Sequence, residues 1–412
     1  MDRRAFLRGV STLTIVSTSS SGWLAYDYDL VNPNDGPAYQ PWKDWQDHTA
    51  NSPADAPLAG PLTLVRAAIL AASPHNTQPW RFKVSESSIE LILDRSRFVG
   101  DLDPYLREEA IGMGCALENL LLAAPANGYT ATVTLFPAQL TQNTPEAASK
   151  FETVARVHLT PVLTPALTPA PRQASDLYRA IPNRHTNRHP YDPQQPLPQA
   201  FLDELAHLPH PDEDARIFLF TDPTQRRKIV DISALANQTL YSDPRIESAS
   251  QSWLRLSRRD VRLHQDGIDI DAFGLSPAMT TLANLLPTST LRNMVDKGQK
   301  EGYAERMFAA PLIGILGVRN RYDRAQCLLA GRLWQRAHLL ATARGHAARP
   351  CSEAIELIDY ERLQNRPPVT LDQLGHITGA PDWQPIFLFL MGHASHTAGP
   401  GPRRGVRAVL DA

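Results

Sequence analysis

Two long helical patterns lie on either side of a proline-dense connector in this sequence. Apolar residues recur at helical spacing over residues 107–124, and Pro125 and Gly128 are expected to end that helix. A second pattern of similar length covers 324–344 and ends at Gly345. The connector, residues 160–171, reads Thr-Pro-Val-Leu-Thr-Pro-Ala-Leu-Thr-Pro-Ala-Pro, which marks a domain boundary. The chain is therefore predicted to fold as two related halves.

Short alternating or wholly apolar runs, typical of β-strands, accompany each long helix. They cover 89–93, 130–136 and 157–159 in the first half, and 216–220, 311–318 and 385–391 in the second. Strands mixed with long helices, twice over, predict an α+β fold duplicated in one chain as a pseudo-dimer, with long central helices and flanking antiparallel or mixed sheets. The expected boundaries are 31–60 for a linker or arm, 61–165 for the first half, and 175–412 for the second half with an insertion near 240–310.

Composition limits the classes of function. The chain of 412 residues is 42% hydrophobic and 20% charged, which is ordinary for a globular protein with a sizeable core. A formal net charge of -2 argues against nucleic-acid binding, because such proteins carry basic surfaces that neutralise phosphate. Cys115, Cys327 and Cys351 are odd in number and widely spaced, so they predict buried thiols rather than a disulfide framework or a zinc site.

The N-terminus has the pattern of an export signal. Residues 2–8 read Asp-Arg-Arg-Ala-Phe-Leu-Arg, a twin-arginine pair followed by a weakly apolar run over 9–25. Residues 1–30 are therefore predicted to be a twin-arginine signal, and the protein to be exported folded, as a periplasmic or membrane-tethered protein. A basic amphipathic helix is the alternative interpretation, and no clear cleavage site follows the run.

Three polar segments are candidates for ligand binding. Residues 73–82, Ser-Pro-His-Asn-Thr-Gln-Pro-Trp-Arg-Phe, place several hydrogen-bonding groups on a rigid loop, although an elaborate helix cap would look similar. Residues 184–188, Arg-His-Thr-Asn-Arg, would point Arg184, Thr186 and Arg188 the same way in an extended chain. Two guanidinium groups beside a hydroxyl form a phosphate clamp, and a solvated basic turn is the alternative. The arginines of 402–407 could add charge to the same anion.

The first two segments resemble motifs of the nitroreductase family of flavoproteins. Residues 71–82 are similar to its Ser-x-x-Asn-x-Gln-Pro-Trp segment, and 184–188 to its Arg-x-Ser-x-Arg phosphate motif, with Thr for Ser. Residues 114–124 resemble the family's central dimer helix, and 331–345 a second copy. From about residue 60 to its end, the chain is similar to the long two-domain subgroup of Acg-like FMN-binding proteins. The resemblance implies a nitroreductase-like fold and one bound FMN.

The two halves depart from that family in complementary ways. The first half has the Ser/Asn loop but no Arg-x-Ser/Thr-x-Arg motif over 26–62, and the second half has the phosphate motif without a following Asn-x-Gln-Pro-Trp. In the homodimeric family these two elements come from different subunits. The resemblance therefore implies one complete site per chain, at the junction of the halves.

The resemblance also implies roles for individual residues. Arg184, Thr186 and Arg188 would bind the phosphate and ribityl chain, Ser73 and Asn76 the ring edge or ribityl, Arg403 and Arg404 the phosphate end, and Ser352 the region near the reactive ring nitrogen. No side chain is predicted to be catalytic, because hydride transfer belongs to the flavin. No metal site is predicted.

Three functions remain open. The first is an FMN-dependent oxidoreductase that passes two electrons to a flat small-molecule acceptor such as a nitroaromatic or quinone; outside the cytoplasm, a quinol or redox protein would replace NAD(P)H as donor. The second is an FMN-binding or FMN-sequestering protein in which residues 245–300 act as a lid, although they could instead extend the core. The third is a partner-binding protein with a degenerate site. A monomer is expected, because the other half of the chain already occupies the usual partner surface.

Overall fold

A computed structural model describes residues 36–46, 60–144, 149–162, 174–275, 279–280, 283 and 286–411. The predicted twin-arginine signal, residues 1–30, lies outside these residues, as do residues 163–171 of the connector. Of the helices in the described ranges, none has the length and apolar character needed to cross a membrane.

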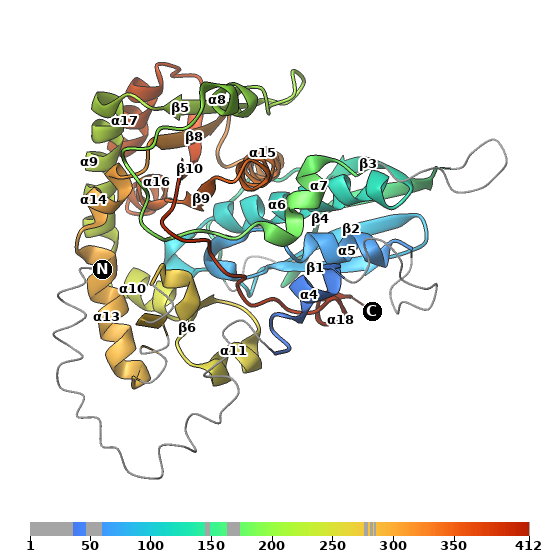
Figure 1. The fold of residues 1–412 in the computed structure, drawn as a ribbon. Coiled ribbons are helices and arrows are strands. Elements are labelled where there is room, and N and C mark those ends of the chain that lie inside the picture. The colour runs from blue at the N-terminus through green and yellow to red at the C-terminus, as the bar shows by residue number, and fades with distance from the viewer. Residues whose placement is uncertain are drawn as a thin grey trace, which may run out of the picture.

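The first half is built around one four-stranded antiparallel sheet and one long helix (Figure 1). Its elements are α4 (Gln40–Gln46), α5 (Leu62–Ala68), β1 (Trp80–Val84), β2 (Ser88–Asp94), α6 (Arg107–Ala126), β3 (Tyr129–Leu135) and β4 (Phe151–Pro161). The strands lie in the order β1-β2-β4-β3, and every neighbouring pair is antiparallel. Exposure alternates along β3, so one face of the sheet meets solvent there, as the alternating sequence predicts.

The second half repeats this arrangement and carries an insertion. Its elements are α7 (Asp176–Ala180), α8 (Gln199–Ala206), β5 (Ala215–Phe220), α9 (Pro223–Leu240), α10 (Pro244–Gln251), β6 (Leu254–Arg255), α11 (Arg258–His264), β7 (Ile268–Asp269), α13 (Thr288–Lys300), α14 (Tyr303–Phe308), β8 (Leu312–Val318), α15 (Arg324–Ala343), β9 (Ala347–Pro350), α16 (Glu353–Leu363), α17 (Val369–Thr378), β10 (Gln384–Gly392) and α18 (Val406–Val409). The strand order is β5-β8-β10-β9, again antiparallel throughout.

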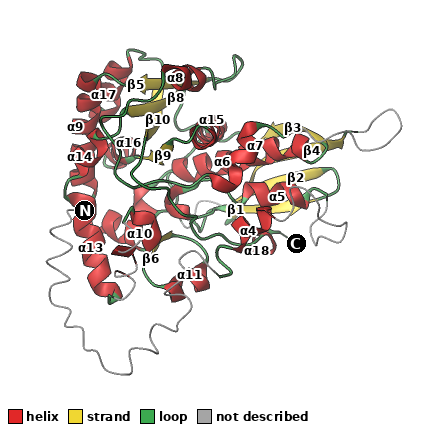
Figure 2. Ribbon diagram, viewed as in Figure 1, coloured by secondary structure: helices red, strands yellow, loops and turns green. Residues whose placement is uncertain are grey.

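The same topology therefore occurs twice. In each half the sheet runs in the order first, second, fourth, third strand, and the 20-residue helix lies between the second and third strands in the sequence. The predicted α+β class is confirmed, with antiparallel sheets in both halves. Figure 2 shows the two sheets at opposite sides of the helix pair α6 and α15.

Helices α6 and α15 pack with their backbones in direct contact. A Cβ atom added to Gly331 would lie 2.0 Å from the carbonyl oxygen of Ile111, and one added to Gly114 would lie 2.1 Å from that of Leu328. Glycine is thus required on both sides of the crossing, because any side chain would force the helices apart. The Cys115 thiol donates to the Gly331 carbonyl at 3.3 Å, which ties the two helices at the same point.

The second sheet is buried on both faces, which explains its continuous apolar strands. All seven residues of β8 are buried. On β10, Phe387 and Phe389 pack towards α15 in the core that continues into the first half, whereas Leu388 and Leu390 pack in a second core with α9 and α16. The core on the α15 side includes residues of both sheets, so the two halves share one apolar interior.

The last residues of the chain return to the first half. After β10 the tail crosses the molecule to α18, beside α5 and β1 (Figure 1). Leu410 bridges to Phe82 of β1, and the Asp411 amide donates to the Phe82 carbonyl at 2.7 Å. The tail therefore runs past the junction between the halves.

One detail of the first long helix differs from the prediction. Pro125 does not end the first long helix: it lies inside α6, which continues to Ala126, and Gly128 follows with a left-handed φ of 83°. A proline near the C-terminal end removes a single helical hydrogen bond, so the helix tolerates it there. The three cysteines are buried free thiols, as predicted.

Candidate cofactor site

A cavity of about 250 Å³ lies where the two halves, the insertion and the C-terminal tail meet. All the residues singled out from the sequence except Arg404 line it, namely Ser73, Asn76, Arg184, Thr186, Arg188, Ser352 and Arg403. They come from four separate stretches of the chain, so the fold brings together the polar loop, the arginine segment, the start of α16 and the tail.

The polar loop between α5 and β1 has an unusual backbone. His75, Asn76 and Gln78 have left-handed φ angles of 43°, 57° and 51°. Such angles are costly for residues other than glycine and cluster at functional sites. The Ser73 hydroxyl accepts a hydrogen bond of 3.1 Å from the Gln78 amide, which closes the loop on itself. The loop is therefore a preformed structure rather than a simple helix cap.

Asn76 ties this loop to the insertion and to the tail. Its side-chain amide donates to the carbonyl oxygens of Gly267 at 3.0 Å and Pro402 at 2.8 Å, and its side-chain oxygen accepts from Arg403. Asn76 thus lines the cavity, as predicted, while its hydrogen-bonding groups already have protein partners.

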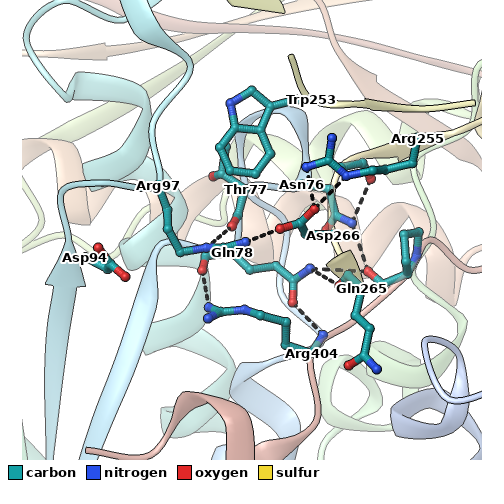
Figure 3. Close-up of polar contacts among 12 residues, drawn as sticks. Asn76, Thr77, Gln78, Asp94, Arg97, Trp253, Arg255, Gln265, Asp266 and Arg404 are labelled. Carbon is teal, nitrogen blue, oxygen red and sulfur yellow. Dashed lines mark hydrogen bonds and ion pairs between the residues drawn. The ribbon is translucent and has the colours of Figure 1, made fainter. Parts of the chain in front are cut away.

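Figure 3 shows a polar network behind the loop, on the side of the insertion. The Gln78 side chain donates to the Gln265 carbonyl at 2.9 Å and accepts from the Arg404 amide at 2.9 Å. Arg97 donates to the Thr77 carbonyl at 2.7 Å and pairs with Asp266, which also pairs with Arg255 at 2.7 Å. The network fixes the insertion against the loop. Gln78 belongs to the polar motif found in the sequence, whereas no local sequence pattern pointed to Asp266.

Arg184 crosses from the second half into the first. It follows the short helix α7, is only 2% exposed, and donates to the Leu70 carbonyl at 3.1 Å. Its other terminal nitrogen lies 3.4 Å from His338 Nδ1, and His338 Nε2 lies 3.3 Å from the His185 carbonyl. Nδ1 can accept from arginine while Nε2–H donates to the carbonyl, so a neutral His338 satisfies both contacts. Burial accordingly lowers the pKa of His338 well below its usual value.

Three arginines line the cavity without a carboxylate of their own: Arg184 and Arg403 are buried, and Arg188 is partly buried. Arg188 donates to the Ala272 carbonyl at 3.4 Å, and Arg403 to the Ala71 carbonyl at 3.1 Å. Among the described residues, neither these two nor Arg184 forms an ion pair. The Nε atoms of Arg184 and Arg403 are buried without any hydrogen-bond partner in that part of the chain. Cationic donors that remain unmatched around a cavity favour an anionic ligand.

The electrostatics agree with that geometry. Burial lowers the pKa of Arg184 and of Arg188 to about 10, and lowers the pKa of Arg403 well below its usual value. Asp269 partly offsets the positive charge at Arg188 and Arg403. Tyr39 of the arm donates to Asp269 at 2.6 Å, and burial raises the pKa of Asp269 to about 6. The three arginines that line the cavity therefore outnumber Asp269, the carboxylate that acts on two of them.

The histidines of the two motifs are neutral. Burial and then the charge of Arg188 lower the pKa of His75 to about 4, and burial with Arg184 and Arg403 lowers that of His185 to about 3. His75 Nε2 lies 3.1 Å from the Ser250 hydroxyl of the insertion, and the His185 ring packs edge-on against Trp42 at 4.8 Å. The His75 ring therefore contacts a hydroxyl, and the His185 ring packs on an aromatic side chain.

Arg404 is the exception among the predicted residues. It does not line the cavity. Its guanidinium instead donates to the carbonyls of Gln78 and Trp80, on the other side of the tail from Arg403. Successive side chains of an extended chain point in opposite directions, so only one of two adjacent arginines can face the cavity. The assignment of Arg404 to an anion is therefore not supported.

Residues of α16 and α6 also line the cavity. Ser352 precedes α16, and its carbonyl accepts from the amides of Ile355 at 2.8 Å and Glu356 at 2.9 Å. Glu108 of α6 and Glu356 of α16 are among them. The sequence analysis missed both carboxyls, because neither belongs to a motif and only the packing of α6 near α16 brings them together.

A second cavity of about 660 Å³ adjoins the first. Both are lined by Arg188, Tyr241, Ile268, Gln299, Pro350, Cys351 and Glu353. The second one is largely apolar, with Leu291 and Val295 of α13 on one wall and Tyr303 of α14 on another. The insertion that was interpreted as a lid or as added core thus encloses a chamber next to the arginine-lined cavity.

Comparison with known proteins gives partial matches. No protein-family model matches the chain. It is 32% identical over 130 residues to a Mycobacterium tuberculosis protein named "Putative NAD(P)H nitroreductase Rv3131", which covers 31% of this chain and 33% of that protein. It is 38% identical over 73 residues to the M. tuberculosis "Putative NAD(P)H nitroreductase acg", covering 18% and 22%. The alignments thus span about a third or less of the length of these relatives.

Among solved structures, the FMN-dependent nitroreductase NfnB of Mycobacterium smegmatis in complex with NADPH matches 57% of this chain and 97% of its own. The sequence identity is 16% and the TM-score is 0.35.

Proposed function

We propose that the chain is an FMN-dependent oxidoreductase of nitroreductase type that binds one FMN in the arginine-lined cavity. The observation that carries this proposal is that Arg184, Arg188 and Arg403, buried or partly buried and without ionic partners in the described chain, line one cavity with the strained loop of residues 73–78. The names of the partial relatives point to the same activity. We also interpret the repeated topology as an internal pseudo-dimer.

The chemistry of the donor groups fits FMN. A phosphate monoester is a dianion with strong acceptor oxygens, and guanidinium groups bind such oxygens with charge-assisted hydrogen bonds. The two adjoining cavities together lie within the volume range of about 300–1,000 Å³ usual for small-molecule sites. When bound, FMN supplies hydride transfer, and the chain supplies binding, orientation and electrostatics.

In this proposal different residues of the cavity bind different parts of FMN. Arg184, Arg188 and Thr186 hold the phosphate and ribityl groups, and Arg403 adds charge from the tail. The ring is proposed to sit near Ser352, which lines the same cavity. A flat small-molecule acceptor, such as a nitroaromatic or a quinone, enters through the apolar chamber beyond the shared wall and is reduced in the first cavity, near the start of α16.

A flavin-sequestering protein is the second candidate function. It is favoured by the enclosure of the site, because Gly267, Asp269 and Ala272 of the insertion line the cavity and the network of Figure 3 fastens the insertion in place. A lid that stays closed would admit neither donor nor acceptor.

Reduction kinetics distinguish these candidates. The apoprotein is loaded with FMN, and bleaching of the flavin absorbance is followed after mixing with NADPH, NADH or a naphthoquinol, and then its return with a nitroaromatic or quinone. The enzyme proposal expects bleaching by at least one donor and reoxidation by an acceptor. Stoichiometric FMN that no donor bleaches would favour sequestration, and a protein that takes up no FMN would reject both.

We further propose that residues 1–30 direct twin-arginine export and that the exported protein is a monomer. The Arg3-Arg4 pair in the sequence supports export. The packing of α15 on α6 within one chain supports a monomer, because it covers the surface on which a second chain would pack. Export would make a quinol or a redox protein the donor. A reporter protein fused to residues 1–35 should be exported. The double substitution Arg3→Lys and Arg4→Lys should abolish that export, and unchanged export of the double variant would reject the signal. Light scattering should report one chain of 45.6 kDa, and a dimer would reject the monomer.

A further inference from the structure

A two-electron reduction of an acceptor consumes one proton besides the hydride, and one end of the cavity carries a candidate source. Glu356 lies on the first turns of α16 and lines the cavity opposite Glu108 of α6. Glu356 is 5% exposed and Glu108 is 7% exposed. Two carboxyl groups from different halves of the chain are thus held at one buried wall.

Glu356 has no cation to stabilise a negative charge. Within the described residues it forms no ion pair, and its Oε2 atom is buried without a hydrogen-bond partner. The guanidinium of Arg107 forms its hydrogen bonds with other groups: it donates to Asp359 at 2.7 Å, to the Ile386 carbonyl at 2.8 Å and to Glu108 at 3.2 Å. Asp359 in turn pairs with Arg321 at 3.0 Å.

The surrounding charges also favour the neutral acid. Burial, followed by the charges of Glu108 and Glu353, raises the pKa of Glu356 well above its usual value. Burial likewise raises the pKa of Glu108, which Arg107 partly offsets. The groups that face Glu356 are Glu108 and Arg107 from α6, Asp103 before α6, Glu353 on its own helix, and Tyr241 at the end of α9. Only Arg107 among them is cationic.

We infer, resting on the function proposed above, that Glu356 is the proton donor for the molecule reduced in this cavity. As a neutral acid its Oε2–H is a donor without a described protein acceptor, so a ligand oxygen can accept it. For a quinone acceptor, the hydride from the reduced cofactor adds to the quinone and the O–H bond of Glu356 breaks as an O–H bond forms on the quinone oxygen. The products are the hydroquinone, the oxidised cofactor and the Glu356 carboxylate, which takes its next proton from water.

The protonation state can be measured without any cofactor. The infrared spectrum of the wild-type apoprotein at pH 7, minus that of the Glu356→Gln apoprotein, should contain the carbonyl stretch of a protonated carboxylic acid. Carboxylate bands in that difference would overturn the inference. Glutamine is neutral and nearly isosteric, so this substitution introduces no charge at the site.

Proton delivery is measured with FMN-loaded protein that has been photoreduced and mixed with menadione. Glu356→Gln should bind FMN normally and react about 100-fold more slowly or worse, as is usual when a general acid is removed. The matched control is Glu361→Gln on the same helix, where the carboxyl accepts from Thr370 at 2.7 Å and does not line the cavity. The control should react at the wild-type rate.

A second variant tests the inference if the Glu356→Gln protein does not fold. Glu108→Gln keeps the acid but removes a like charge that raises the pKa of Glu356, so the rate should decline at lower pH than in the wild type. An unshifted pH profile would contradict the assignment. If FMN binds and Glu356→Gln reacts at the wild-type rate, only this inference fails; if the wild type takes up no FMN, the proposed function fails and the proton-donor role falls with it.

Discussion

The guanidinium of Arg184 donates a hydrogen bond of 3.1 Å to the carbonyl oxygen of Leu70, which lies 114 residues earlier in the chain. Leu70 follows helix α5 and leads into the strained loop of residues 73–78. This contact holds the arginine segment of the second half against the polar loop of the first. The proposed cofactor site depends on that relationship, because neither segment lines the cavity alone.

Loss of a clamp arginine should weaken FMN binding. Arg184→Gln and Arg188→Gln each remove charge-assisted hydrogen bonds that contribute about 1.5–3 kcal/mol, so the Kd for FMN should rise about 10- to 150-fold. The exposed Arg179, which pairs with Asp176 at 2.9 Å, provides the control Arg179→Gln. Quenching of flavin fluorescence measures the Kd. Equal affinities for all three variants and the wild type would contradict the clamp.

An arginine kept for ligand binding should lower the stability of the apoprotein. Arg188 makes one hydrogen bond of 3.4 Å to the protein, and its charge has no ionic partner in the described chain. Arg188→Met should therefore stabilise the apoprotein by at least about 1 kcal/mol, since buried charges replaced by apolar groups often give such gains. Urea unfolding of the apoprotein measures this difference. A loss of stability in Arg188→Met would mean that the arginine serves the fold rather than a ligand.

The glycine crossing of the long helices should tolerate no side chain. Gly331→Ala places a Cβ 2.0 Å from the Ile111 carbonyl oxygen, so α6 and α15 must separate, and overpacking of this kind costs about 1–3 kcal/mol or more. Gly375 in helix α17 has open space around it, and Gly375→Ala should stabilise the chain by about 0.5–1 kcal/mol. Urea unfolding of both variants tests the crossing. Similar stabilities would show that the helices do not meet so closely.

Acid should destabilise the chain through His75. Its pKa in the folded state is about 4, below the ordinary value of 6.5, so the stability it contributes is present above pH 6.5 and is lost as the pH falls towards 4. His75→Asn should reduce that loss by up to about 3 kcal/mol, because each pKa unit corresponds to about 1.4 kcal/mol. Asparagine also tolerates the left-handed φ of 43° at this position. Thermal unfolding from pH 4 to 7 is the measurement, and parallel curves for variant and wild type would contradict it.

The sequence predicted the elements whose signal is local. The wholly apolar run 311–318 became the buried central strand β8, and the helical patterns became α6 and α15. The arginine segment and the polar loop were also found, because each is a short contiguous motif. Arg403 and Arg404 were assigned the same role, because the sequence does not show which of two adjacent arginines faces the cavity.

Residues that reach the site through tertiary packing gave no such signal. Trp42 lies in the segment predicted as a linker or arm. Its indole donates to the Gly401 carbonyl at 2.8 Å, and its ring packs against Arg403. Glu356 and Asp269 are ordinary acidic residues in the sequence. Their placement depends on how α16 and the insertion fold over the first half, which is a long-range arrangement that no local periodicity encodes.

The crystal structure of the chain with FMN tests the central claim most directly. The account predicts one FMN per chain, with its phosphate oxygens within hydrogen-bonding distance of Arg184 and Arg188 and its ring between the loop of residues 73–78 and the start of α16. A phosphate bound elsewhere, with these arginines still without an anion, would contradict the assignment of the cofactor and of the chemistry built on it.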